Sequence, residues 1–496
     1  MAIAKVCGIE TEYGVHVVTS GEMSPTTASS VLINGYVSHL ERRIGWDFED
    51  ESPGRDARGF AREGSMPPEV ETHLVNAVLT NGARYYVDHA HPEYSTPECS
   101  DPLQLVRFDR AGELTLQRSM QAARELLQPG EEIIVYKHNS DGKGNSYGCH
   151  ENYLVDRAVP FAQIVQRLTP HLVTRQVYAG AGKVGQENSE TDHPVSYQLS
   201  QRADFFEEEV GLETTLKRPI INTRDEPHAD PQKYRRLHVI VGDANLAEVA
   251  TFLKVGSTAF VLAMIEDGFD TGRELSLANP VSAIRAVSHD PSLAATVELV
   301  DGQRLSGVEL QWELFSMARK YAEERGLAAL GDDEVGELVL ERWEHVLSGL
   351  ETDPMSLSSE LDWVAKLRLI EGYRERHGLE WSDRRLAALD LQYHDVRPHK
   401  SLFRRLNVEA LIAEADVETA VSEPPDTTRA YFRGRCLSKF AAAIVAANWD
   451  SVVFDVGTDP LRRVPMMEPL RGTAAHVATL LEACESPAEL VERLGS

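Results

Sequence analysis

The sequence predicts an α+β fold, in which strands and loops fill the first half of the chain and helices fill most of the second half. Alternating side chains and nearby turns predict strands within 5–15, 131–155 and 235–247. Apolar residues three and four positions apart predict helices over 253–268, 311–326, 337–351 and 358–378. Gly378 is expected to end the last helix, because glycine readily adopts the left-handed conformation of a helix cap.

Bulk composition indicates an ordinary soluble globular protein. The chain has 496 residues, of which 42% are hydrophobic and 26% are charged. Its net charge of −28 disfavours a nucleic-acid partner, because phosphate contacts need clustered cations. We find no run of about 18 apolar residues and no signal peptide, so we expect a cytoplasmic protein with no membrane partner. The five cysteines include no C-x-x-C pair, which argues against a disulfide scaffold and a cysteine zinc site.

We expect one large domain over 1–420 and one small C-terminal α/β domain over 421–496. Adjacent prolines and polar residues at 421–430 mark the boundary. The small domain is predicted to contain a helix over 430–449, an apolar strand and one or two closing helices. Within the large domain, about 38–78 is rich in charge, Gly and Pro, so we interpret it as a mobile insertion.

The most informative segment is 81–98, NGARYYVDHAHPEYSTPE, which predicts a β-ribbon. Side chains alternate along a strand, so Arg84, Tyr86 and Asp88 should share one face. A cation, a phenol and a carboxylate are costly to bury together without a partner. The pattern therefore predicts either a ligand site or a surface ion pair between Arg84 and Asp88.

Carboxylates in and near this ribbon favour a magnesium site. Glu10 and Glu12 alternate along the first predicted strand, and Glu93 lies in the ribbon itself. Mg²⁺ in a nucleotide site takes one or two carboxylates and completes its shell with water and phosphate oxygens. His150 and Asn152, and His238 and Asn245, add neutral donors on strand-like segments, although a lone strand histidine is as often a core residue.

A zinc hydrolase is a competing interpretation, because His89, His91 and Glu93 also alternate and could supply zinc ligands. These odd-numbered residues are expected to lie opposite the even-numbered face of the ribbon. Pro92, however, predicts a bend or bulge, which would change the face to which the neighbouring side chains point.

Six cations between Lys217 and Arg236 form a local exception on an acidic chain. They predict either a solvated cationic face or a groove for an anionic ligand or peptide. The second interpretation makes this segment a candidate docking surface.

Five segments together resemble the family of Pup ligases and Pup deamidases/depupylases: GIETEYG, NGARYYVDHAHPEYSTPEC, NSYGCHENYL, INTRDEPHADPQKYRRLHVIVGDAN and WDSVVFDVG. The similarity runs from about Ile9 to the C-terminus. It implies the carboxylate-amine ligase fold of glutamine synthetase, with a curved antiparallel sheet cradle packed with helices. The pattern from Trp46 to Phe60 is similar to the long polar lid of the depupylases, whereas the ligases have a shorter connection.

The resemblance also implies an ATP and Mg²⁺ site on the sheet. The implied metal-site residues are Glu10, Tyr86, Glu93, His150 and His238. Arg84 matches a phosphate-contacting arginine, and Thr96 and Trp449 match nucleotide contacts. Asp88 matches the catalytic aspartate, which either attacks the scissile carbonyl or acts as a base toward water. Weaker candidates for substrate binding, in the cationic groove, are Arg202 and Arg224.

The implied activity is ATP-dependent amide hydrolysis, which releases Pup from lysine side chains and converts a C-terminal glutamine of Pup to glutamate. The implied partners are Pup and pupylated proteins, with the proteasomal ATPase ring as a further candidate. Two alternatives stay open. One is a Pup–protein ligase that forms the same bond through a γ-glutamyl phosphate, and the other is a non-catalytic, nucleotide-dependent Pup-binding adaptor.

Overall fold

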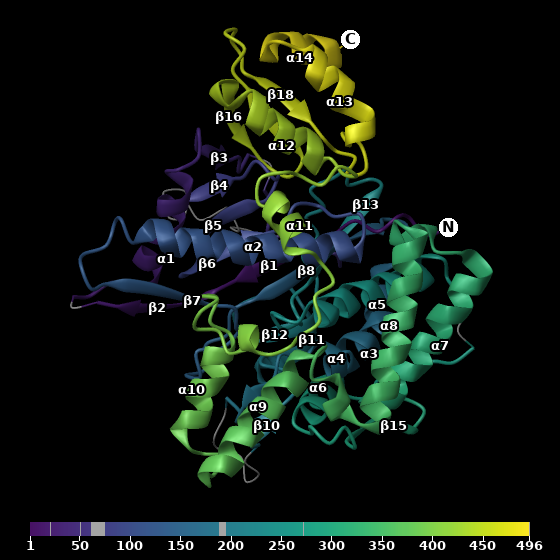
Figure 1. Ribbon diagram of the computed structural model, residues 1–496. Helices are drawn as coiled ribbons and strands as arrows, with labels where there is room; N and C mark the ends of the chain where they lie inside the picture. Colours follow the sequence, from purple (N-terminus) through teal and green to yellow (C-terminus); the bar gives the residue numbers. More distant parts are fainter. Residues whose placement is uncertain (20, 50, 61–74, 188–194, 271, 496) are drawn as a thin grey trace.

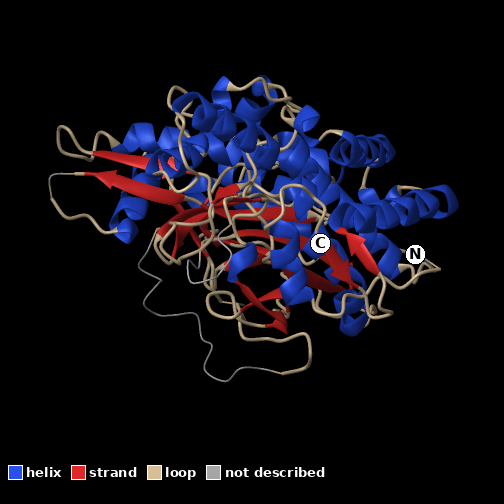
Figure 2. Cartoon of the chain, turned by 90° about the horizontal axis from the view of Figure 1, so that it is seen from below, coloured by secondary structure: helices blue, strands red, loops and turns tan. Residues whose placement is uncertain are grey.

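The computed structural model describes residues 1–19, 21–49, 51–60, 75–187, 195–270 and 272–495. At its centre lies a ten-stranded curved sheet (Figures 1 and 2). In spatial order its strands are β13 (Tyr234–Val239), β8 (Cys149–Asp156), β1 (Cys7–Glu12), β6 (His91–Ser95), β5 (Arg84–Asp88), β4 (Asn76–Val78), β3 (Ile44–Trp46), β16 (Ile444–Ala447), β17 (Ser451–Phe454) and β18 (Arg462–Pro465). Neighbouring strands are antiparallel except β3 and β16, which are parallel. The predicted α+β class with a curved, largely antiparallel sheet is confirmed.

Helices cover one face of this sheet, chiefly α1 (Pro25–Val37), α2 (Pro102–Ala123) and α5 (Glu248–Glu266). The Tyr85 hydroxyl reaches into this layer and donates to Ser119 Oγ at 3.0 Å. Gly112 of α2 lies so close to the neighbouring strand that a Cβ would stand 2.5 Å from the Tyr94 ring. This close packing forms the core and leaves the other sheet face for polar side chains.

The four predicted helices are present as α5, α7 (Gly307–Arg325), α8 (Asp333–Thr352) and α9 (Asp362–His377). Gly378 follows α9 with φ 60° and ψ 44°, which confirms the predicted left-handed cap. By length and composition α5 could span a membrane, a feature that we did not expect from the sequence. All of its apolar stretch is buried inside the protein, so α5 is a core helix of a soluble fold.

The remaining elements surround this core. The other helices are α3 (Phe161–Thr174), α4 (Gln176–Ala179), α6 (Pro280–Ser288), α10 (Arg384–Tyr393), α11 (Glu414–Ala420), α12 (Ala430–Lys439), α13 (Ala474–Ala483) and α14 (Pro487–Gly495). Small two-stranded sheets pair β2 (Gly14–Val18) with β7 (Glu132–Tyr136), β9 (Lys183–Val184) with β10 (Tyr197–Gln198), β11 (Phe206–Gly211) with β12 (Arg218–Asn222), and β14 (Thr296–Glu298) with β15 (Arg304–Ser306).

The C-terminal segment differs in one respect from the prediction, because the helix expected over 430–449 ends at Lys439. The chain continues as β16, in which Ile444 and Ala447 are buried in an apolar cluster with Trp46. Burial against β3 therefore outweighs the local helical pattern of this alanine-rich stretch. Because the sheet continues from β3 into β16, the domain boundary at 421 stays a prediction.

The predicted insertion at about 38–78 contains two strands of the central sheet, β3 and β4. Ile44 and Val78 are paired across these strands and are both buried. The low periodicity suggested a polar loop, but the segment also contains buried strands. Residues 50 and 61–74 of the insertion lie outside the described residues.

Candidate active site

Polar side chains from five neighbouring strands gather on the sheet face opposite the helices. Directly paired residues in a sheet point to the same face, so the register identifies which side chains meet. The relevant pairs are Glu10 with His150, Asn152 with His238, Glu12 with Glu93, Tyr86 with Glu93, Glu10 with Ser95, and Arg84 with Ser95. The predicted alignment of Arg84, Tyr86 and Asp88 on one face is confirmed.

A two-residue turn at His89 and Ala90 explains how Asp88 and Glu93 reach the same face. Asp88 pairs with His91 and Tyr86 pairs with Glu93 across this hairpin. The sequence interpretation counted alternation through the whole ribbon and placed the facing reset near Pro92. The change in which side chains share a face occurs three residues earlier, at His89, because the chain reverses direction there.

The predicted zinc set His89, His91 and Glu93 does not come together. His89 lies in the turn, with 61% of its side chain exposed, and pairs with Asp88. His91 instead approaches Glu12, with Nδ1 3.7 Å from Oε2. Within the described residues, His, Cys, Asp and Glu form two compact groups of three, and neither contains His89 or His91.

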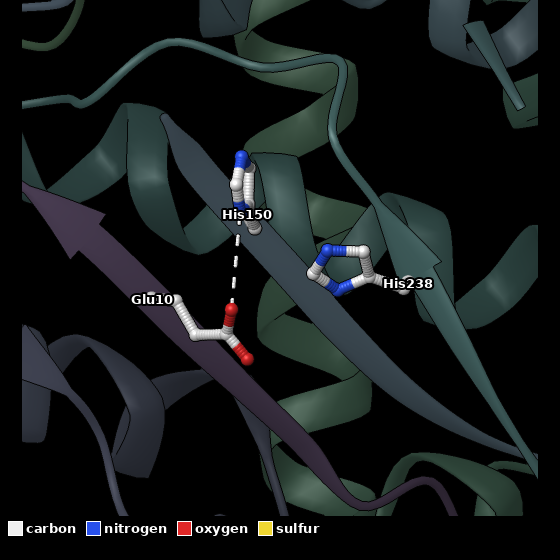
Figure 3. A group of neighbouring side chains, drawn as sticks. All are labelled: Glu10, His150 and His238. Atoms are coloured by element: carbon white, nitrogen blue, oxygen red, sulfur yellow. Dashed lines mark ion pairs between the residues drawn. The ribbon is translucent and has the colours of Figure 1, made fainter. Parts of the chain in front are cut away.

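The first group comprises Glu10, His150 and His238, which meet from β1, β8 and β13 (Figure 3). One potential ligand atom from each residue lies within 4.8 Å of the others. His150 Nδ1 is 3.7 Å from Glu10 Oε2. The group thus combines a carboxylate with two imidazoles and brings together three of the five metal-site residues that the family resemblance implied, whereas Glu93 belongs to a second group.

Asn152 connects two members of this group. Its Nδ2 donates to Glu10 Oε1 at 2.8 Å, and its Oδ1 accepts from His238 Nδ1 at 2.9 Å. A histidine that donates through Nδ1 keeps a lone pair on Nε2, the form that binds a metal. Burial lowers the pKa of His238 well below its usual value, which favours this neutral form.

Glu10 is held as a carboxylate. Burial opposes its ionisation, but the hydrogen bond with His150 and the charge of Arg236 hold its pKa well below the usual range. Arg236 Nη1 lies 3.7 Å from Glu10 Oε1 and donates to Asn152 Oδ1 at 2.7 Å. Asn152 was predicted beside His150 as a neutral donor, whereas Arg236 was predicted only as part of the cationic segment, although it alternates with His238 on β13.

The second group comprises Glu12, Asp88 and Glu93. Burial, followed by the neighbouring Asp88 and Glu12 carboxylates, raises the pKa of Glu93 well above its usual value. Tyr86 lies beside this group, and its hydroxyl donates to Glu93 Oε1 at 2.5 Å. Three crowded carboxylates repel one another, and a divalent cation would remove that cost. This donor set fits Mg²⁺, which prefers oxygen ligands.

Arg84 is held flat between two aromatic rings. Its guanidinium carbon lies 4.0 Å from the Trp46 ring centre and 3.9 Å from the Tyr86 ring centre. Its Nε donates to Asn76 Oδ1 at 3.0 Å. Stacking and one hydrogen bond preorganise the guanidinium for an anionic group such as phosphate. Trp46 was not predicted, and the low periodicity around it offered no signal.

An apolar pocket opens beside Glu10, on the same sheet face. It is lined by Val6, Cys7, Gly8, Ile9, Glu10, Ser95, Thr96, Pro97, Glu98, Asn152, Tyr153, Leu154, Pro227, His228, Arg236, Arg429, Trp449 and Pro469. Thr96 and Trp449, the two predicted nucleotide contacts, therefore meet here. The flat apolar lining next to a polar metal-type cluster suits an aromatic base with its phosphates.

Trp449 reaches this pocket from the C-terminal segment. Its ring packs edge-on against Trp46, with ring centres 5.2 Å apart, and its carbonyl accepts from Arg433 Nη1 at 2.9 Å. Thr96 Oγ1 accepts from the Ile9 amide at 3.0 Å. The pocket wall thus depends on contacts between the sheet and a segment more than 300 positions away in the sequence.

The two predicted substrate-binding arginines have different surroundings. Arg202 is 2% exposed, and its guanidinium donates to the carbonyls of Ile240 and Gly242 and to Ser146 Oγ. Its Nε and Nη1 donors are engaged by the protein, which favours a structural role. The Nε atom of Arg224 is buried with no hydrogen-bond partner among the described residues, so Arg224 is the better candidate for a ligand.

The predicted cationic docking surface does not form as one face. Arg235 is buried, and Arg236 turns toward Glu10 and Glu226. Lys233 is exposed but pairs with Glu468. Lys217 is the exposed member at the other end of the segment. Three of these six cations, Lys233, Arg235 and Arg236, pair with carboxylates within the fold, so local charge density did not predict an open patch.

The fold and site define a class: proteins with a curved, largely antiparallel sheet that carries compact carboxylate and imidazole groups beside an apolar pocket on one face. The chain belongs to the Pup ligase/depupylase family, because the family model described as Pup-ligase protein matches residues 5–453. Full-length relatives include a depupylase from Acidothermus cellulolyticus, 56% identical, and a Pup deamidase/depupylase from Mycobacterium tuberculosis, 51% identical. Each alignment covers 99% of this chain and 99% of the relative.

Ligases of the family are less similar in sequence. A Pup–protein ligase from Nakamurella multipartita is 40% identical over 97% of this chain and 99% of the relative. Two solved structures of the Pup ligase PafA share the fold. A complex with Pup has a TM-score of 0.82 at 33% identity and covers 99% of this chain and 92% of that one. A complex with ADP has a TM-score of 0.75 at 35% identity, covering 89% and 97%.

Proposed function

We propose that this chain is a Pup deamidase and depupylase that uses ATP and Mg²⁺ as cofactors. It hydrolyses the isopeptide bond between the C-terminal glutamate side chain of Pup and a substrate lysine. It also converts a C-terminal glutamine of Pup to glutamate. The observation that carries this proposal is the full-length identity of 51–56% with depupylases, against 40% with a ligase.

The site residues divide into four proposed roles. Glu10, His150 and His238 would hold one divalent cation, and Glu12 and Glu93 would contribute to a second, with Tyr86 orienting Glu93. Arg84 would contact the phosphates, and Thr96 and Trp449 the nucleoside. Arg224 is the proposed contact to the substrate carboxylates, whereas Arg202 would hold the backbone around the site in place through its hydrogen bonds. When bound, Mg²⁺ would supply positive charge that stabilises a developing oxyanion.

Asp88 is the proposed catalytic residue. Burial opposes its ionisation, but the hydrogen bond and charge of His89 hold its pKa below the usual value. An ionised carboxylate can attack a carbonyl carbon, so the proposed route is nucleophilic. An Asp88 oxygen then bonds to the γ-carbonyl carbon, the C–N bond breaks, and a water molecule gives the departing amine its proton. Water cleaves the resulting anhydride and regenerates Asp88.

The direct test is incubation of the protein with a Pup–protein conjugate, with and without ATP and Mg²⁺. The proposal expects release of free Pup and of unmodified protein only when both cofactors are present. Hydroxylamine added during turnover should trap the anhydride as a Pup γ-hydroxamate. Stoichiometric ADP and a new conjugate from free Pup would favour the ligase instead. Nucleotide-dependent Pup binding without either reaction would favour an adaptor.

The proposed partners are Pup and pupylated proteins, in the cytoplasm. Contact with the proteasomal ATPase ring stays a prediction from the family resemblance. Co-sedimentation of the purified protein with that ring, with and without a Pup conjugate, would test it.

A further inference from the structure

The backbone at His89 has a conformation that L-residues rarely adopt. Its φ is 51°, and it is the first of the two central residues of the hairpin that joins β5 to β6. A two-residue hairpin with positive φ at the first central position normally carries glycine there. Histidine therefore costs conformational energy at this position, and the shape of the turn alone does not require it.

The His89 side chain uses this conformation to contact Asp88. Its Nδ1 lies 2.9 Å from Asp88 Oδ2. An ionised carboxylate can only accept, so Nδ1 carries the proton and donates. The two residues are adjacent in the sequence. The left-handed backbone conformation of His89 lets its imidazole reach the Asp88 carboxylate.

Helix α1 holds the turn from the other side. Ser29 Oγ donates to the carbonyl of Ala90 at 2.8 Å, and Thr26 Oγ1 donates to the carbonyl of His89 at 3.5 Å. Ser29 is fully buried. Strained turns persist only where their surroundings determine them, and these bonds from a helix supply that constraint.

We propose that His89 is a positioning residue for hydrolysis, whose imidazole fixes the Asp88 carboxylate so that Oδ1 faces the scissile carbonyl. With Oδ2 engaged, the carboxylate loses rotational freedom before substrate binds, which lowers the entropic part of the barrier. This inference rests on the proposed function of Asp88. It adds a residue that does not belong to either metal-type group.

Three substitutions separate this role from a role in the turn. His89→Gly removes the donor and relieves the backbone, and His89→Ala removes the donor only. His89→Asn keeps an amide donor near the position of Nδ1 and tolerates positive φ. Lys217→Gly is the matched control, because Lys217 is exposed and has φ 48°.

For cleavage of a Pup conjugate, kcat of His89→Ala and His89→Gly should fall about tenfold or more. KM and nucleotide affinity should stay unchanged. His89→Asn should remain within about threefold of wild type, because it keeps the donor. His89→Gly should melt at or above the wild-type temperature despite its low kcat, since strain is removed.

Wild-type kcat in His89→Gly would overturn the proposal, as would an Asn variant that loses as much activity as the Ala variant. Crystal structures of the variants give a readout that does not depend on turnover. Asp88 Oδ2 should face residue 89 in wild type and His89→Asn and should rotate away in His89→Ala. An unchanged Asp88 in His89→Ala would also contradict the proposal. A wild-type protein that cleaves no conjugate would instead contradict the proposed function, and the crystallographic comparison would still decide the role of His89.

Discussion

Glu98 Oε1 accepts a hydrogen bond from Arg429 Nε at 2.7 Å, which joins the segment after β6 to the C-terminal part of the chain. Arg433 also pairs with this carboxylate and is itself fully buried. Burial opposes ionisation of Glu98, but the two guanidinium groups lower its pKa to about 2. Glu98 and Arg429 both line the proposed nucleotide pocket.

Replacing this carboxylate should destabilise the protein. Glu98→Gln leaves two buried arginines unpaired, so the free energy of unfolding should fall by about 3–5 kcal/mol. Urea denaturation at pH 7 measures the effect. Glu423→Gln removes an exposed partner of Arg435 and serves as control, with an expected loss below about 1 kcal/mol. Equal losses in the two variants would contradict a special role for Glu98.

The same carboxylate should contribute an acid-sensitive part of stability. The folded-state pKa of about 2 lies below the unfolded value of 4.5, so the contribution is complete above pH 4.5 and decreases as pH falls toward 2. The difference in unfolding free energy between wild type and Glu98→Gln should therefore shrink across this range. A difference that is constant from pH 6 to the acid limit of folding would refute this assignment.

Asp88→Asn should abolish hydrolysis while sparing cofactor binding. Asn keeps the shape but is a poor nucleophile, so kcat should fall at least about a thousandfold. Affinity for a non-hydrolysable ATP analogue, measured by calorimetry, should stay within about threefold. Asp301→Asn in the exposed β14–β15 turn controls for a surface change. Normal conjugate cleavage by Asp88→Asn would exclude the catalytic assignment.

Arg84→Lys should weaken nucleotide binding. Lysine keeps the charge but cannot stack as a planar group between Trp46 and Tyr86 or bind phosphate in a bidentate manner. The Kd for the ATP analogue should rise about tenfold, equivalent to about 1.4 kcal/mol. The control is Arg304→Lys, at an exposed position on strand β15. Unchanged affinity would place the phosphates elsewhere.

Asn152→Leu should raise the magnesium requirement. The substitution removes both the donor to Glu10 and the acceptor for His238 Nδ1. Loss of such an orienting partner typically costs about 10–100-fold in metal affinity. Titration of Mg²⁺ against conjugate cleavage should show this shift, whereas Asn407→Leu at an exposed site should not. A wild-type Mg²⁺ dependence in Asn152→Leu would remove these residues from the metal site.

Gly112→Ala should destabilise the fold without touching the site. Its Cβ would approach the Tyr94 ring to 2.5 Å, so α2 must shift from the sheet at a cost of about 1–3 kcal/mol. Gly372→Ala is the matched control, because it lies in helix α9 with open space around it and should stabilise by about 0.5–1 kcal/mol. Chemical denaturation should show a lower free energy of unfolding for Gly112→Ala and a higher one for Gly372→Ala than for wild type. An unchanged free energy of unfolding in Gly112→Ala would show that α2 can move away from Tyr94 without a cost in stability.

Local patterns in the sequence predicted those features that depend on a single segment. Strand alternation put Arg84, Tyr86 and Asp88 on one face, and three- and four-residue spacing located α5, α7, α8 and α9. Gly378 was predicted as a helix cap because only its own backbone conformation was involved. The family resemblance added Thr96 and Trp449, which no local pattern indicated.

Contacts between distant segments decided the rest. The relation of Asp88 to Glu93 depended on where the hairpin turned, and β16 formed where Ala446 and Ala447 pair with β3. The orientation of His238 depended on Asn152, which lies 86 positions earlier. By itself the sequence determined which faces are polar and which segments are helical, since these follow from backbone periodicity. Only the tertiary structure decided which polar faces meet, because strand register and burial depend on hydrogen bonds and packing between remote parts of the chain.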